Sequence, residues 1–530
     1  MSGQGTRFQA AGYKDIKPLI PVNGTPIIER LLSAFPERWP AHFVYAENHI
    51  STPLPDLLRK LRPNAKQTAI PVLRTGPAAP TLEALKNIPP DAPVLVSYCD
   101  YGMSWDPALF EEFVVNSECD ACVISYKGFH AHYRSPQPYA YCRMEGERVV
   151  EVREKGWFTD NREQEFASCG AYYFRSASIL ADAIAKQKDY GLYINDELYI
   201  SLTVEALLRS TPNAHVRIFE IPGFYQWGTP ADLQEHEYWE RSTKCHSRYL
   251  GQIPNLKNFT VDNILMPMAG LGSRFRGITS LPKPFIPLNT EPMFEAALNT
   301  LPRALQATSI VALREHQRYF ECLNPSKNEK LKLNFILLNK TPPGQALSVE
   351  MGLQGRKLEG DLLVSSCDHG IVLNPDLWKK FRQKPNCDAA IFTMKGFPGA
   401  ARKPKSYAWV VPKNTEEPFP IVERIGVKEQ VSETPINDAV LVGTFWFKSQ
   451  EILQKGIELL KTSNIKVNNE VYLDSVFDLL QQSGQTVRQI PLDGYLCWGD
   501  PDSLAEALYW QELFLGHRLD RRPRFPGVPS

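Results

Sequence analysis

The sequence has no long basic stretch, and its charges balance. It contains 59 Lys and Arg residues and 59 Asp and Glu residues, so its formal net charge is zero. Proteins that bind nucleic acid or anionic membranes usually present clusters of positive charge. The sequence also has no apolar run long enough to cross a bilayer and no secretory signal before its first glycines. These absences predict a cytoplasmic protein that binds neither nucleic acid nor a membrane.

Cysteine is too scarce for a disulfide scaffold. The chain has 10 cysteines among 530 residues, and a cytoplasmic setting would keep them reduced. Cys119 and Cys122 have the spacing of zinc ligands, but structural zinc needs four ligands and no second pair stands at a matching distance. Both lie in an apolar run, as does the matching stretch 387–390. We therefore expect these cysteines in strands of a sheet.

Two common glycine-rich phosphate loops are missing. No Gly-Lys-Ser/Thr follows Gly270 and Gly272, and the third glycine of the dinucleotide fingerprint is absent. Instead, an apolar run at 264–268, predicted to be a buried strand, leads into these glycines, where backbone N–H groups can approach a phosphate. Arg274 and Lys283 follow and supply two cations. An isolated glycine pair is usually an ordinary turn, but this combination predicts a triphosphate site.

The same pattern occurs near the start of the chain, and an internal repeat decides the architecture. Further matched residues follow in the same order in both halves. The spacing from lysine to glycine, and from glycine to glutamate, is identical in the two copies. The matched pairs are Gly3 and Gly270, Gly5 and Gly272, Arg7 and Arg274, Lys17 and Lys283, Asp100 and Asp368, Lys155 and Lys428, Gly170 and Gly443, and Glu197 and Glu470.

Length and repeat together predict two domains, 1–250 and 263–530, joined by a polar linker at 251–262. Each domain is expected to be a doubly wound, Rossmann-like α/β fold with a mixed, mainly parallel sheet and helices on both faces. Because Met1 aligns with Met268, the first copy lacks the strand at 263–267. That strand would be central, so either the chain starts upstream or another segment fills the gap.

Local patterns predict the first elements of the first half. A helix is expected at 27–35, a strand at 43–46, and a second helix at 51–61 with Ser51 as its N-cap. Later, the apolar strands ending at Asp100 and Asp368 should direct a carboxylate into the crevice where open α/β sheets bind ligands. Since Mg²⁺ prefers oxygen ligands, these residues are predicted magnesium ligands. The alternative is an aspartate that caps the following turn.

The glycines, the arginine and the later Lys-Pro-x-Ile-Pro segment, repeated in both halves, resemble the sugar-1-phosphate nucleotidylyltransferases. The resemblance covers nearly the whole chain, twice. It implies a GT-A-like nucleotidyltransferase fold, a nucleoside triphosphate and a sugar phosphate as substrates, and Mg²⁺ as cofactor. It also implies a second acidic metal ligand two residues before the glycine of a Trp-Gly motif. Here Gln226 and Cys497 occupy that position, and Asp500 is a substitute in the second half unless it only shapes a turn.

The resemblance further implies the contacts of base and acceptor. Ala78 and Gln345 would lie near the nucleobase, although an ordinary helix start explains them equally well. Lys155 and Lys428 would hold the attacking phosphate. Glu154 would contact the acceptor beside Lys155, whereas Val427 replaces it in the second half. The remaining acceptor-binding residues would be Gly170, Glu197, Gly443 and Glu470, the two glutamates alternatively belonging to helix N-caps.

The expected reaction is attack of a phosphate oxygen on the α-phosphorus of a nucleoside triphosphate, with release of pyrophosphate. The attacking oxygen is already anionic, so positioning and charge neutralisation suffice. The product would be a nucleotide sugar for polysaccharide synthesis, or the product of a non-sugar phosphate. Three alternatives remain open: one domain as a regulatory pseudoenzyme or dimer-like partner, a nucleotide-sugar sensor, and a glycosyltransferase. Glycosyltransferases usually show Asp-x-Asp at the metal strand, which is absent here.

Overall fold

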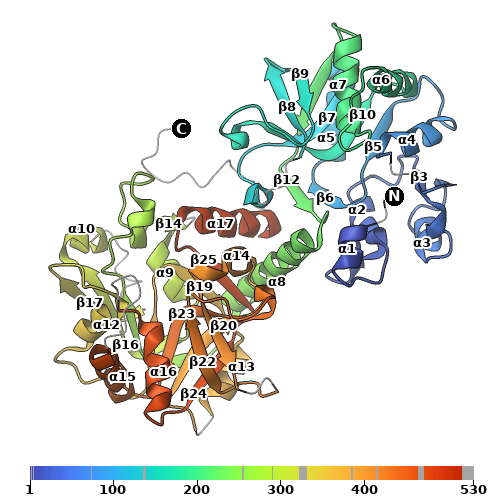
Figure 1. Cartoon of the computed structure of the whole chain (residues 1–530). Helices are drawn as coiled ribbons and strands as arrows, with labels where there is room; N and C mark the ends of the chain where they lie inside the picture. The colour runs from blue at the N-terminus through green and yellow to red at the C-terminus, as the bar shows by residue number, and fades with distance from the viewer. Residues whose placement is uncertain are drawn as a thin grey trace. The chain divides into compact units, whose positions relative to one another are not determined.

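The computed structural model divides the chain into two compact units (Figure 1), Met1–Glu237 and Tyr238–Leu515. The boundary lies inside helix α8 (Pro230–Gln252), and strand β13 (Thr260–Pro267) begins within the stretch 251–262 that the sequence suggests as a linker. The described residues are 1, 3, 5–72, 75–134, 139–253, 256–288, 291–321, 331–383, 386–413, 416–463 and 471–515.

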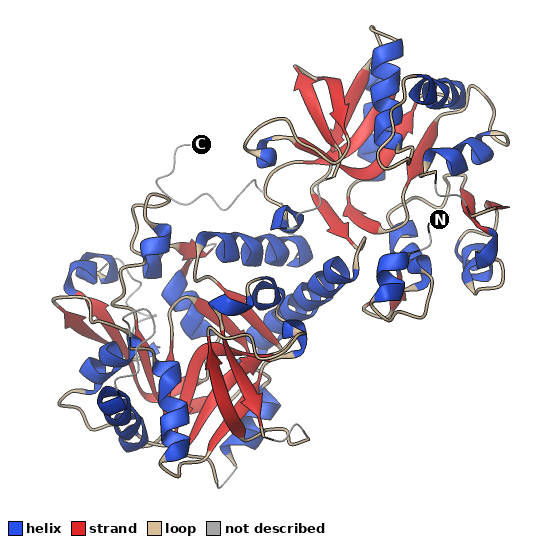
Figure 2. Cartoon of the chain, viewed as in Figure 1, coloured by secondary structure: helices blue, strands red, loops and turns tan. Residues whose placement is uncertain are grey.

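The second unit contains the mixed sheet that the sequence predicts, mainly parallel along its central path (Figure 2). Its strands follow the order β17 (Leu333–Leu338), β16 (Arg303–Leu313), β13, β18 (Leu362–Ser365), β23 (Ala439–Phe447), β20 (Ala389–Met394) and β24 (Val487–Pro491). The first four strands are parallel neighbours, and β24 is parallel to β20. Only β23 runs against both of its neighbours on this path. Strand β13, which leads into the glycine loop, is therefore central.

The first unit repeats this arrangement with one interruption. The strands of its main sheet and of one separate pair are β3 (His42–Ala46), β4 (Lys66–Ile70), β5 (Val94–Ser97), β7 (Ala121–Tyr126), β8 (Tyr141–Glu145), β9 (Arg148–Arg153), β10 (Phe166–Phe174) and β11 (Val216–Glu220). Strands β3 and β4 form a separate parallel pair, whereas β5 joins the sheet through β10. Among the described residues, no strand stands between β3 and β5 in the place that β13 takes in the second unit. The expected gap is therefore present.

The gap changes the burial of the neighbouring strand. The apolar side chains of β5 are only partly buried, while Leu362, Leu363 and Val364 of β18 are 0% exposed. At the other side of the gap, the amino group of Met1 donates a hydrogen bond to the carbonyl oxygen of Val44, 2.7 Å away. An unpaired edge leaves backbone groups and side chains accessible to water. The sheet of the first unit is thus less protected than that of the second.

The helices begin where local chemistry allows. Helices α5 (Pro107–Ser117) and α13 (Pro375–Arg382) are capped by Asp106 and Asn374, whose side chains accept hydrogen bonds from backbone N–H groups of the first turn. Helix α2 (Ile27–Leu32) and strand β3 confirm the predicted types of element. The prediction of Ser51 as an N-cap is wrong, because α3 (Leu54–Leu61) starts after Pro53. A proline-directed start had replaced the expected serine cap.

A small two-stranded sheet in each unit places the Trp-Gly motif. In the first unit β6 (Tyr101–Ser104) pairs with β12 (Gly223–Gln226), and in the second β19 (His369–Val372) pairs with β25 (Gly494–Cys497). The register sets Gln226 opposite Tyr101 and Cys497 opposite His369. The residues that follow β12 and β25 therefore lie beside the aspartates that precede β6 and β19.

The cysteines lie largely where the sequence places them. Cys122 is in β7, and Cys119 and Cys387 are buried just before β7 and β20. All three are free thiols, and burial raises the pKa of each.

No helix in the described part of the chain is both long and apolar enough to cross a membrane.

Candidate functional site

The second glycine of each phosphate loop lies against the lysine that follows it. Gly5 and Gly272 have φ values of 61° and 58°. A Cβ added to Gly272 would lie 2.8 Å from the Cβ of Lys283, and one added to Gly5 would lie 3.3 Å from the Cβ of Lys17. Both the left-handed backbone and the close contact favour glycine. The loop therefore folds directly onto the lysine in both units.

The first glycine and the arginine of each loop are open to solvent. Gly3 and Gly270 are exposed, with no atom within 4 Å of an added Cβ. Arg7 in α1 (Thr6–Ala10) and Arg274 in η6 (Ser273–Phe275) are exposed too, while the phenylalanine that follows each arginine is buried. The buried ring anchors the turn, so the guanidinium beside it is left available for an anion.

Each lysine forms an ion pair with the predicted metal ligand. The Nζ of Lys17 lies 2.6 Å from Oδ2 of Asp100 and donates to the carbonyl oxygen of Gly228 at 2.9 Å. The Nζ of Lys283 lies 2.5 Å from Oδ2 of Asp368 and donates to Gly499 at 3.0 Å. The structure thus brings together three segments that are far apart in the sequence, in the same way in both units.

These ion pairs keep the two aspartates ionised. Burial opposes the ionisation of Asp100, but the Lys17 ammonium outweighs it and lowers the carboxyl pKa below its ordinary value. Burial likewise opposes the ionisation of Asp368, but Lys283 and His369 outweigh it and lower the pKa of the carboxyl strongly. Burial would lower the pKa of Lys283, yet the charge of Asp368 raises it overall. In both units the aspartate is therefore anionic at neutral pH and contacts the lysine.

The Trp-Gly motif closes the other side of this cluster. The backbone N–H of Trp227 donates to the carbonyl oxygen of Asp100 at 3.0 Å, and that of Trp498 donates to Asp368 at 2.9 Å. A Cβ on Gly228 would lie 3.7 Å from Oδ2 of Asp100. In the second unit, a Cβ on Gly499 would lie 3.6 Å from Oδ2 of Asp368 and 4.0 Å from Nη1 of Arg274. The motif thus holds the aspartate in place from its backbone side.

The first unit has a second carboxylate that the sequence interpretation missed. Asp232 lies in the first turn of α8, and its Oδ2 is 3.7 Å from a Cβ on Gly228, the same distance as Oδ2 of Asp100. Gln226, at the position of the implied second ligand, donates to Oδ1 of Asp232 at 2.8 Å and accepts from Tyr139 at 2.9 Å. Burial raises the pKa of Asp232, and the charge of Asp100 adds to this effect. Gln226 therefore orients a carboxylate instead of supplying one.

The second unit lacks this second carboxylate. Ser503 corresponds to Asp232, and Cys497 corresponds to Gln226. Asp500 accepts hydrogen bonds from the backbone N–H and the hydroxyl of Ser503, at 2.9 and 2.8 Å. This geometry is that of an N-cap at the start of α17 (Pro501–Leu515). The structure thus shows Asp500 in the turn role, the alternative to metal binding.

The donor set is suited to a magnesium ion that also binds phosphate. Mg²⁺ takes one or two carboxylates and completes its shell with water and phosphate oxygens. The first unit offers Asp100 and Asp232 side by side, and the second offers Asp368. Lys17 and Lys283 contact Oδ2 of Asp100 and Asp368, and Oδ1 of Asp368 lies 3.7 Å from Nδ1 of His369. In the part of the chain that the structure describes, no cluster of three or more candidate metal-binding side chains occurs.

The second pair of lysines has an unusual backbone. Lys155, two residues after β9, and Lys428, directly after β22 (Val422–Val427), both have a φ of 55°. Few residues other than glycine adopt this left-handed conformation. Strained backbone that recurs at matched positions marks a functional constraint more often than chance. The conformation directs both lysines in the same way from the ends of their strands.

Each of these lysines contacts a tyrosine that the sequence interpretation missed. The Nζ of Lys155 donates to the hydroxyl of Tyr199 at 3.0 Å and lies 4.8 Å from the centre of its ring. The Nζ of Lys428 lies 5.2 Å from the ring centre of Tyr472. A cation over an aromatic face is attracted by its quadrupole. Tyr199 and Tyr472 each follow the repeated Asn-x-Glu pattern by two residues, which is the signal that would have identified them.

The predicted acceptor carboxylates lie around the first of these lysines. Glu154 accepts a hydrogen bond from the hydroxyl of Ser201 at 2.5 Å, and Glu197 accepts one from Tyr199 at 2.5 Å. Burial raises the pKa of Glu154. The predicted N-cap alternative for the Asn195–Glu197 segment does not hold, because α7 (Ile200–Ser210) starts after Tyr199. Glu470 lies outside the described residues.

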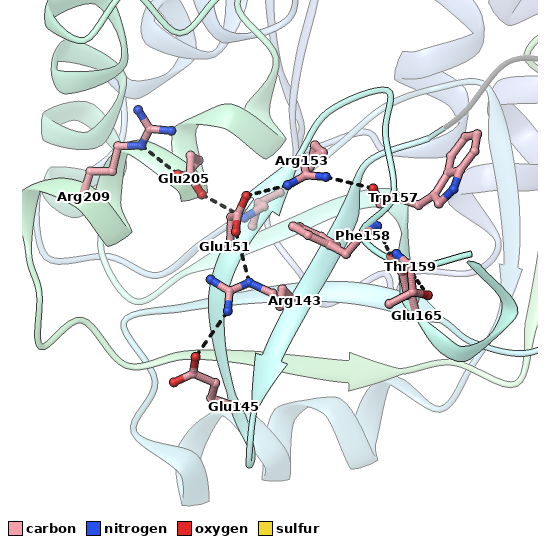
Figure 3. A network of polar contacts seen from close by, with 11 residues as sticks. Arg143, Glu145, Glu151, Arg153, Trp157, Phe158, Thr159, Glu165, Glu205 and Arg209 are labelled. Atoms are coloured by element: carbon pink, nitrogen blue, oxygen red, sulfur yellow. Dashed lines mark hydrogen bonds and ion pairs between the residues drawn. The ribbon is translucent and has the colours of Figure 1, made fainter. Parts of the chain in front are cut away.

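The loop after each lysine is tied back by a hydroxyl and a carboxylate. In the first unit, Glu165 accepts from the backbone N–H groups of Phe158 and Thr159 and from the Thr159 hydroxyl, at 2.6–2.8 Å (Figure 3). In the second unit, the hydroxyl of Ser432 donates to Asp438 at 2.6 Å. These pairs occupy matched positions in the repeat. They hold the lysine-bearing loop in a defined shape in both units.

The two glycines of the acceptor strands contact side chains of the facing strand. Gly170 in β10 has a φ of 95°, and an added Cβ would lie 3.1 Å from the ring of Tyr98. An added Cβ on Gly443 in β23 would lie 3.2 Å from Oγ of Ser366 and 3.4 Å from the imidazole of His369. Glycine therefore makes room for Tyr98 in the first unit and for Ser366 and His369 in the second.

The predicted base-binding residues Ala78 and Gln345 stand one residue apart in the alignment of the two units. The backbone N–H of Ala78 donates to Leu198 at 3.1 Å, and that of Ala346 donates to Val471 at 3.2 Å. Gln345 therefore corresponds to Pro77 and not to Ala78. Ala78 is 0% exposed at the start of α4 (Ala78–Leu85), whereas the amide of Gln345 donates to Oγ of Ser366 at 2.9 Å. Only the second unit has an amide side chain at this position.

Arg7 links the two groups of residues in the first unit. Burial raises the pKa of Tyr199, beside Lys155, and the positive charge of Arg7 acts against this rise. Burial also raises the pKa of Tyr139, beside Gln226, and Arg7 again opposes it. Its guanidinium thus lies within electrostatic range of both groups. Arg7 therefore acts electrostatically on residues of both groups.

Several solved structures resemble parts of the chain. They include a nucleoside-diphosphate-sugar pyrophosphorylase from Vibrio cholerae RC9, 18% identical over 46% of this chain and 99% of its own, with a TM-score of 0.39. A UDP-glucose pyrophosphorylase complexed with UDP-glucose is 17% identical over 47% of this chain and 97% of its own, with a TM-score of 0.38. An inositol-1-phosphate CTP transferase from T. maritima is 14% identical over 49% and 98%, with a TM-score of 0.37. No curated protein sequence matches the chain.

The sequence pattern of one family matches both halves. The MobA-like NTP transferase domain matches residues 1–156 and 265–414. The two matches contain both glycine loops, both Lys–Asp pairs and the first of the two acceptor lysines, Lys155. Together they cover more than half of the chain. The chain therefore belongs to the MobA-like NTP transferase domain family and is a nucleotidyltransferase with two copies of that domain.

Proposed function

We propose that the protein transfers a nucleotidyl group from a nucleoside triphosphate to a sugar-1-phosphate or a similar phosphate acceptor, and releases pyrophosphate. The observation that carries the proposal is the repeated arrangement of a glycine loop, a Lys–Asp ion pair and a second, strained lysine. The first group suits the triphosphate, and the second lysine suits the phosphate of the acceptor. The resemblance of the sequence supports a nucleotide sugar as product and hence a role in polysaccharide synthesis in the cytoplasm.

The residues divide the work by their charge and position. Backbone N–H groups at Gly3, Gly5, Gly270 and Gly272, with Arg7 and Arg274, would hold the triphosphate. Lys17 and Lys283 would neutralise the charge that develops as pyrophosphate leaves. Lys155 and Lys428 would hold the acceptor phosphate close to the α-phosphorus, in line with the leaving group. A phosphate oxygen is already anionic, so no side chain needs to remove a proton.

A magnesium ion bound by Asp100 with Asp232, or by Asp368, would supply Lewis-acid polarisation of the phosphate oxygens. The ion pairs with Lys17 and Lys283 hold these aspartates ionised and oriented. The two units differ in their number of carboxylates, so we expect the first unit to bind the ion more tightly. The difference follows from Asp232 and Ser503 at matched positions.

A second possibility concerns the first unit alone. Its sheet has the gap between β3 and β5, beside the strand that carries Asp100. A catalytic aspartate at the end of a poorly supported strand would be held less firmly. This observation favours a regulatory or scaffolding role for the first unit, with catalysis in the second.

The test is pyrophosphate release in the presence of magnesium. The full chain would be assayed with each common nucleoside triphosphate against hexose-1-phosphates and a polyol phosphate. The variants are Lys17→Ala, Lys283→Ala and the double variant. We expect the double variant to be inactive and each single variant to lose the activity of its own unit, because the partner aspartate and the leaving group lose their cation. As a control, Lys14→Ala changes a lysine near the first loop that forms no ion pair with Asp100.

The outcomes separate the alternatives. Loss of different substrate pairs in the two single variants shows two enzymes in one chain. Complete loss in Lys283→Ala, with full activity in Lys17→Ala, assigns catalysis to the second unit. If the wild type releases no pyrophosphate from any pair, the proposed function is wrong.

A further inference from the structure

One carboxylate beside the acceptor lysine distinguishes the two units. In the first unit Glu154 precedes Lys155, and its Oε2 accepts a hydrogen bond from the hydroxyl of Ser201 at 2.5 Å. In the second unit Val427 precedes Lys428 and has no polar side-chain atom. By sequence alone, the second acceptor site has lost its carboxylate. In the structure another segment, Leu473–Ser475, packs against the strand that precedes Lys428.

The segment that carries Ser201 has a counterpart in the second unit with the same register. Before Ser201, the carbonyl oxygen of Leu198 accepts from Ala78, as that of Val471 accepts from Ala346. One residue further along, Tyr199 lies over Lys155 and Tyr472 lies over Lys428. Counting from these fixed points, Asp474 stands in the position of Ser201.

A third contact, beyond Ser201, confirms this register. Glu205 in α7 accepts a hydrogen bond from the backbone N–H of Val152 in β9 at 2.8 Å, and Figure 3 shows it between Arg209 and that strand. Asp478 in α16 (Val476–Gln482) accepts one from the backbone N–H of Ile425 in β22 at 3.1 Å. Val152 lies two residues before Glu154, and Ile425 lies two residues before Val427. Position 474 therefore faces position 427 as Ser201 faces Glu154.

In the first unit the carboxylate, Glu154, directly precedes the lysine, whereas in the second unit the carboxylate, Asp474, lies in the segment that corresponds to Ser201. Asp474 is partly buried in η11 (Leu473–Ser475), and the charge of Lys428 acts on it, as that of Lys155 acts on Glu154. A glutamate at 427 opposite Asp474 would place two like charges together in a site shielded from water, which is unfavourable. An apolar valine avoids that repulsion. Val427 is therefore the complement of Asp474 and no sign of a damaged site.

We infer that Asp474 binds a hydroxyl group of the phosphate acceptor in the second unit and replaces Glu154 of the first unit in that role. The inference rests on the proposed function. A carboxylate next to a lysine recognises a hydroxylated phosphate, such as a sugar or polyol phosphate, because the lysine takes the phosphate and the carboxylate accepts from a hydroxyl. Since the carboxylate comes from the opposite side of the site, the two units select different acceptors.

The test isolates the second unit in the full chain with Lys17→Ala. In that background, Asp474→Asn and Asp474→Ser are assayed for pyrophosphate release with hexose-1-phosphates and inositol-1-phosphate. We expect the KM for the acceptor to rise about 10- to 100-fold, the effect of a lost hydrogen bond to a charged group, with a smaller change in the KM for the triphosphate. Ser201→Ala in a Lys283→Ala background is the matched control, and it should change the acceptor KM of the first unit only a few-fold.

A rescue variant separates binding from folding. Val427→Glu combined with Asp474→Ser transfers the arrangement of the first unit to the second. We expect it to restore acceptor affinity relative to Asp474→Ser alone, with the acceptor preference shifted towards that of the first unit. A folding defect would not be repaired by a second substitution at a partly buried position.

The outcomes distinguish this inference from the proposed function. An active Lys17→Ala protein whose acceptor KM is unchanged by Asp474→Asn and Asp474→Ser overturns the inference and leaves the proposed function intact. An active wild type with an inactive Lys17→Ala variant also overturns it, because the second unit would then bind no reacting acceptor. Absence of pyrophosphate release by the wild type with every substrate pair overturns the proposed function, and the inference falls with it.

Discussion

At the scale of single residues, the site depends on a contact that only glycine permits. Gly272 combines a left-handed backbone with a distance of 2.8 Å between an added Cβ and the Cβ of Lys283. Gly277, five residues later, has a φ of 83° and nothing within 4 Å of an added Cβ. The two glycines therefore share the backbone requirement and differ only in the contact with the lysine.

We predict that Gly272→Ala greatly reduces the activity of the second unit. Both Gly272→Ala and Gly277→Ala should destabilise the unit by about 1–2 kcal/mol through the left-handed backbone. Only Gly272→Ala pushes Lys283 away from Asp368. Thermal unfolding and kcat/KM, measured in the Lys17→Ala background, check this expectation. Equal losses of activity in the two variants would contradict it.

Asp474 should reduce stability while it serves binding. Burial raises the pKa of its carboxyl to about 6, although the charge of Lys428 opposes this. A folded-state pKa above the unfolded value favours the folded state at low pH, and this advantage is lost as the pH rises through about 6. Above that pH the ionised Asp474 therefore opposes folding.

We predict that Asp474→Asn stabilises the second unit at about pH 8 by about 1–3 kcal/mol and has little effect at about pH 4. The amide keeps the shape of the side chain but cannot ionise. Urea unfolding at the two pH values measures the effect. A stability gain that is the same at both pH values would show that ionisation is not its cause. The combination of higher stability and weaker acceptor binding is typical of a functional group.

At the scale of elements, the acceptor site depends on how one helix is attached to one strand. Glu205 joins α7 to β9, and Asp478 joins α16 to β22, in each case through the backbone N–H two residues before the acceptor carboxylate or its valine counterpart. Glu205 is held in turn by Arg209, 2.7 Å away. The helix positions Tyr199 and Ser201, and the strand positions Glu154 and Lys155. The attachment thus sets the distance between the two sides of the site.

We predict that Glu205→Ala destabilises the first unit by about 2–3 kcal/mol, because it leaves the buried N–H of Val152 without an acceptor. It should also raise the acceptor KM of that unit. Glu205→Gln retains an acceptor oxygen and should cost less than about 1 kcal/mol. Denaturant unfolding and the acceptor KM, in the Lys283→Ala background, provide the measurements. Equal effects of the two substitutions would indicate that the charge and not the hydrogen bond matters.

At the scale of the whole molecule, two copies of one fold differ in the completeness of their sheets. Strand β18 of the second unit lies between β13 and β23, whereas within the described part of the chain β5 of the first unit pairs on one side only, with β10. Strand β3 likewise has β4 as its one strand partner among the described residues. The stability of the two units should therefore differ, and most of all at these strands.

We predict that amide hydrogens of β5 exchange faster than those of β18, by about ten-fold or more under native conditions. An edge without a partner opens with less loss of hydrogen bonds and buried surface. Hydrogen exchange followed by mass spectrometry compares peptides covering Val94–Ser97 and Leu362–Ser365. Strands β7 and β20, which lie between two neighbours in both units, serve as the internal control. Equal exchange of β5 and β18 would contradict the prediction.

Much of the fold can be predicted from the sequence because its signals lie in short segments and occur in both halves of the chain. Apolar runs, glycine loops and capped helix starts depend on neighbouring residues. The repeat allows each pattern to be compared with its counterpart in the other half. The two domains, the α/β fold, the aspartates that follow apolar strands and the missing strand were predicted on this basis and agree with the structure. The short-range prediction that failed, a cap at Ser51, lost to Pro53, which occupies the N-cap position of α3.

The contacts that complete the site join residues distant in the chain, and only the tertiary structure decided them. Asp232 meets Asp100 because β12 pairs with β6, and Tyr199 meets Lys155 because α7 packs on β9. The first unit pairs Glu154 with Ser201, and the second pairs Val427 with Asp474. Neither the strand segment nor the helix segment shows this difference by itself. A sequence records which side chains are present, whereas the folded backbone determines which of them face each other. Val427, which by sequence marks a lost carboxylate, is in the structure the residue that makes room for another one.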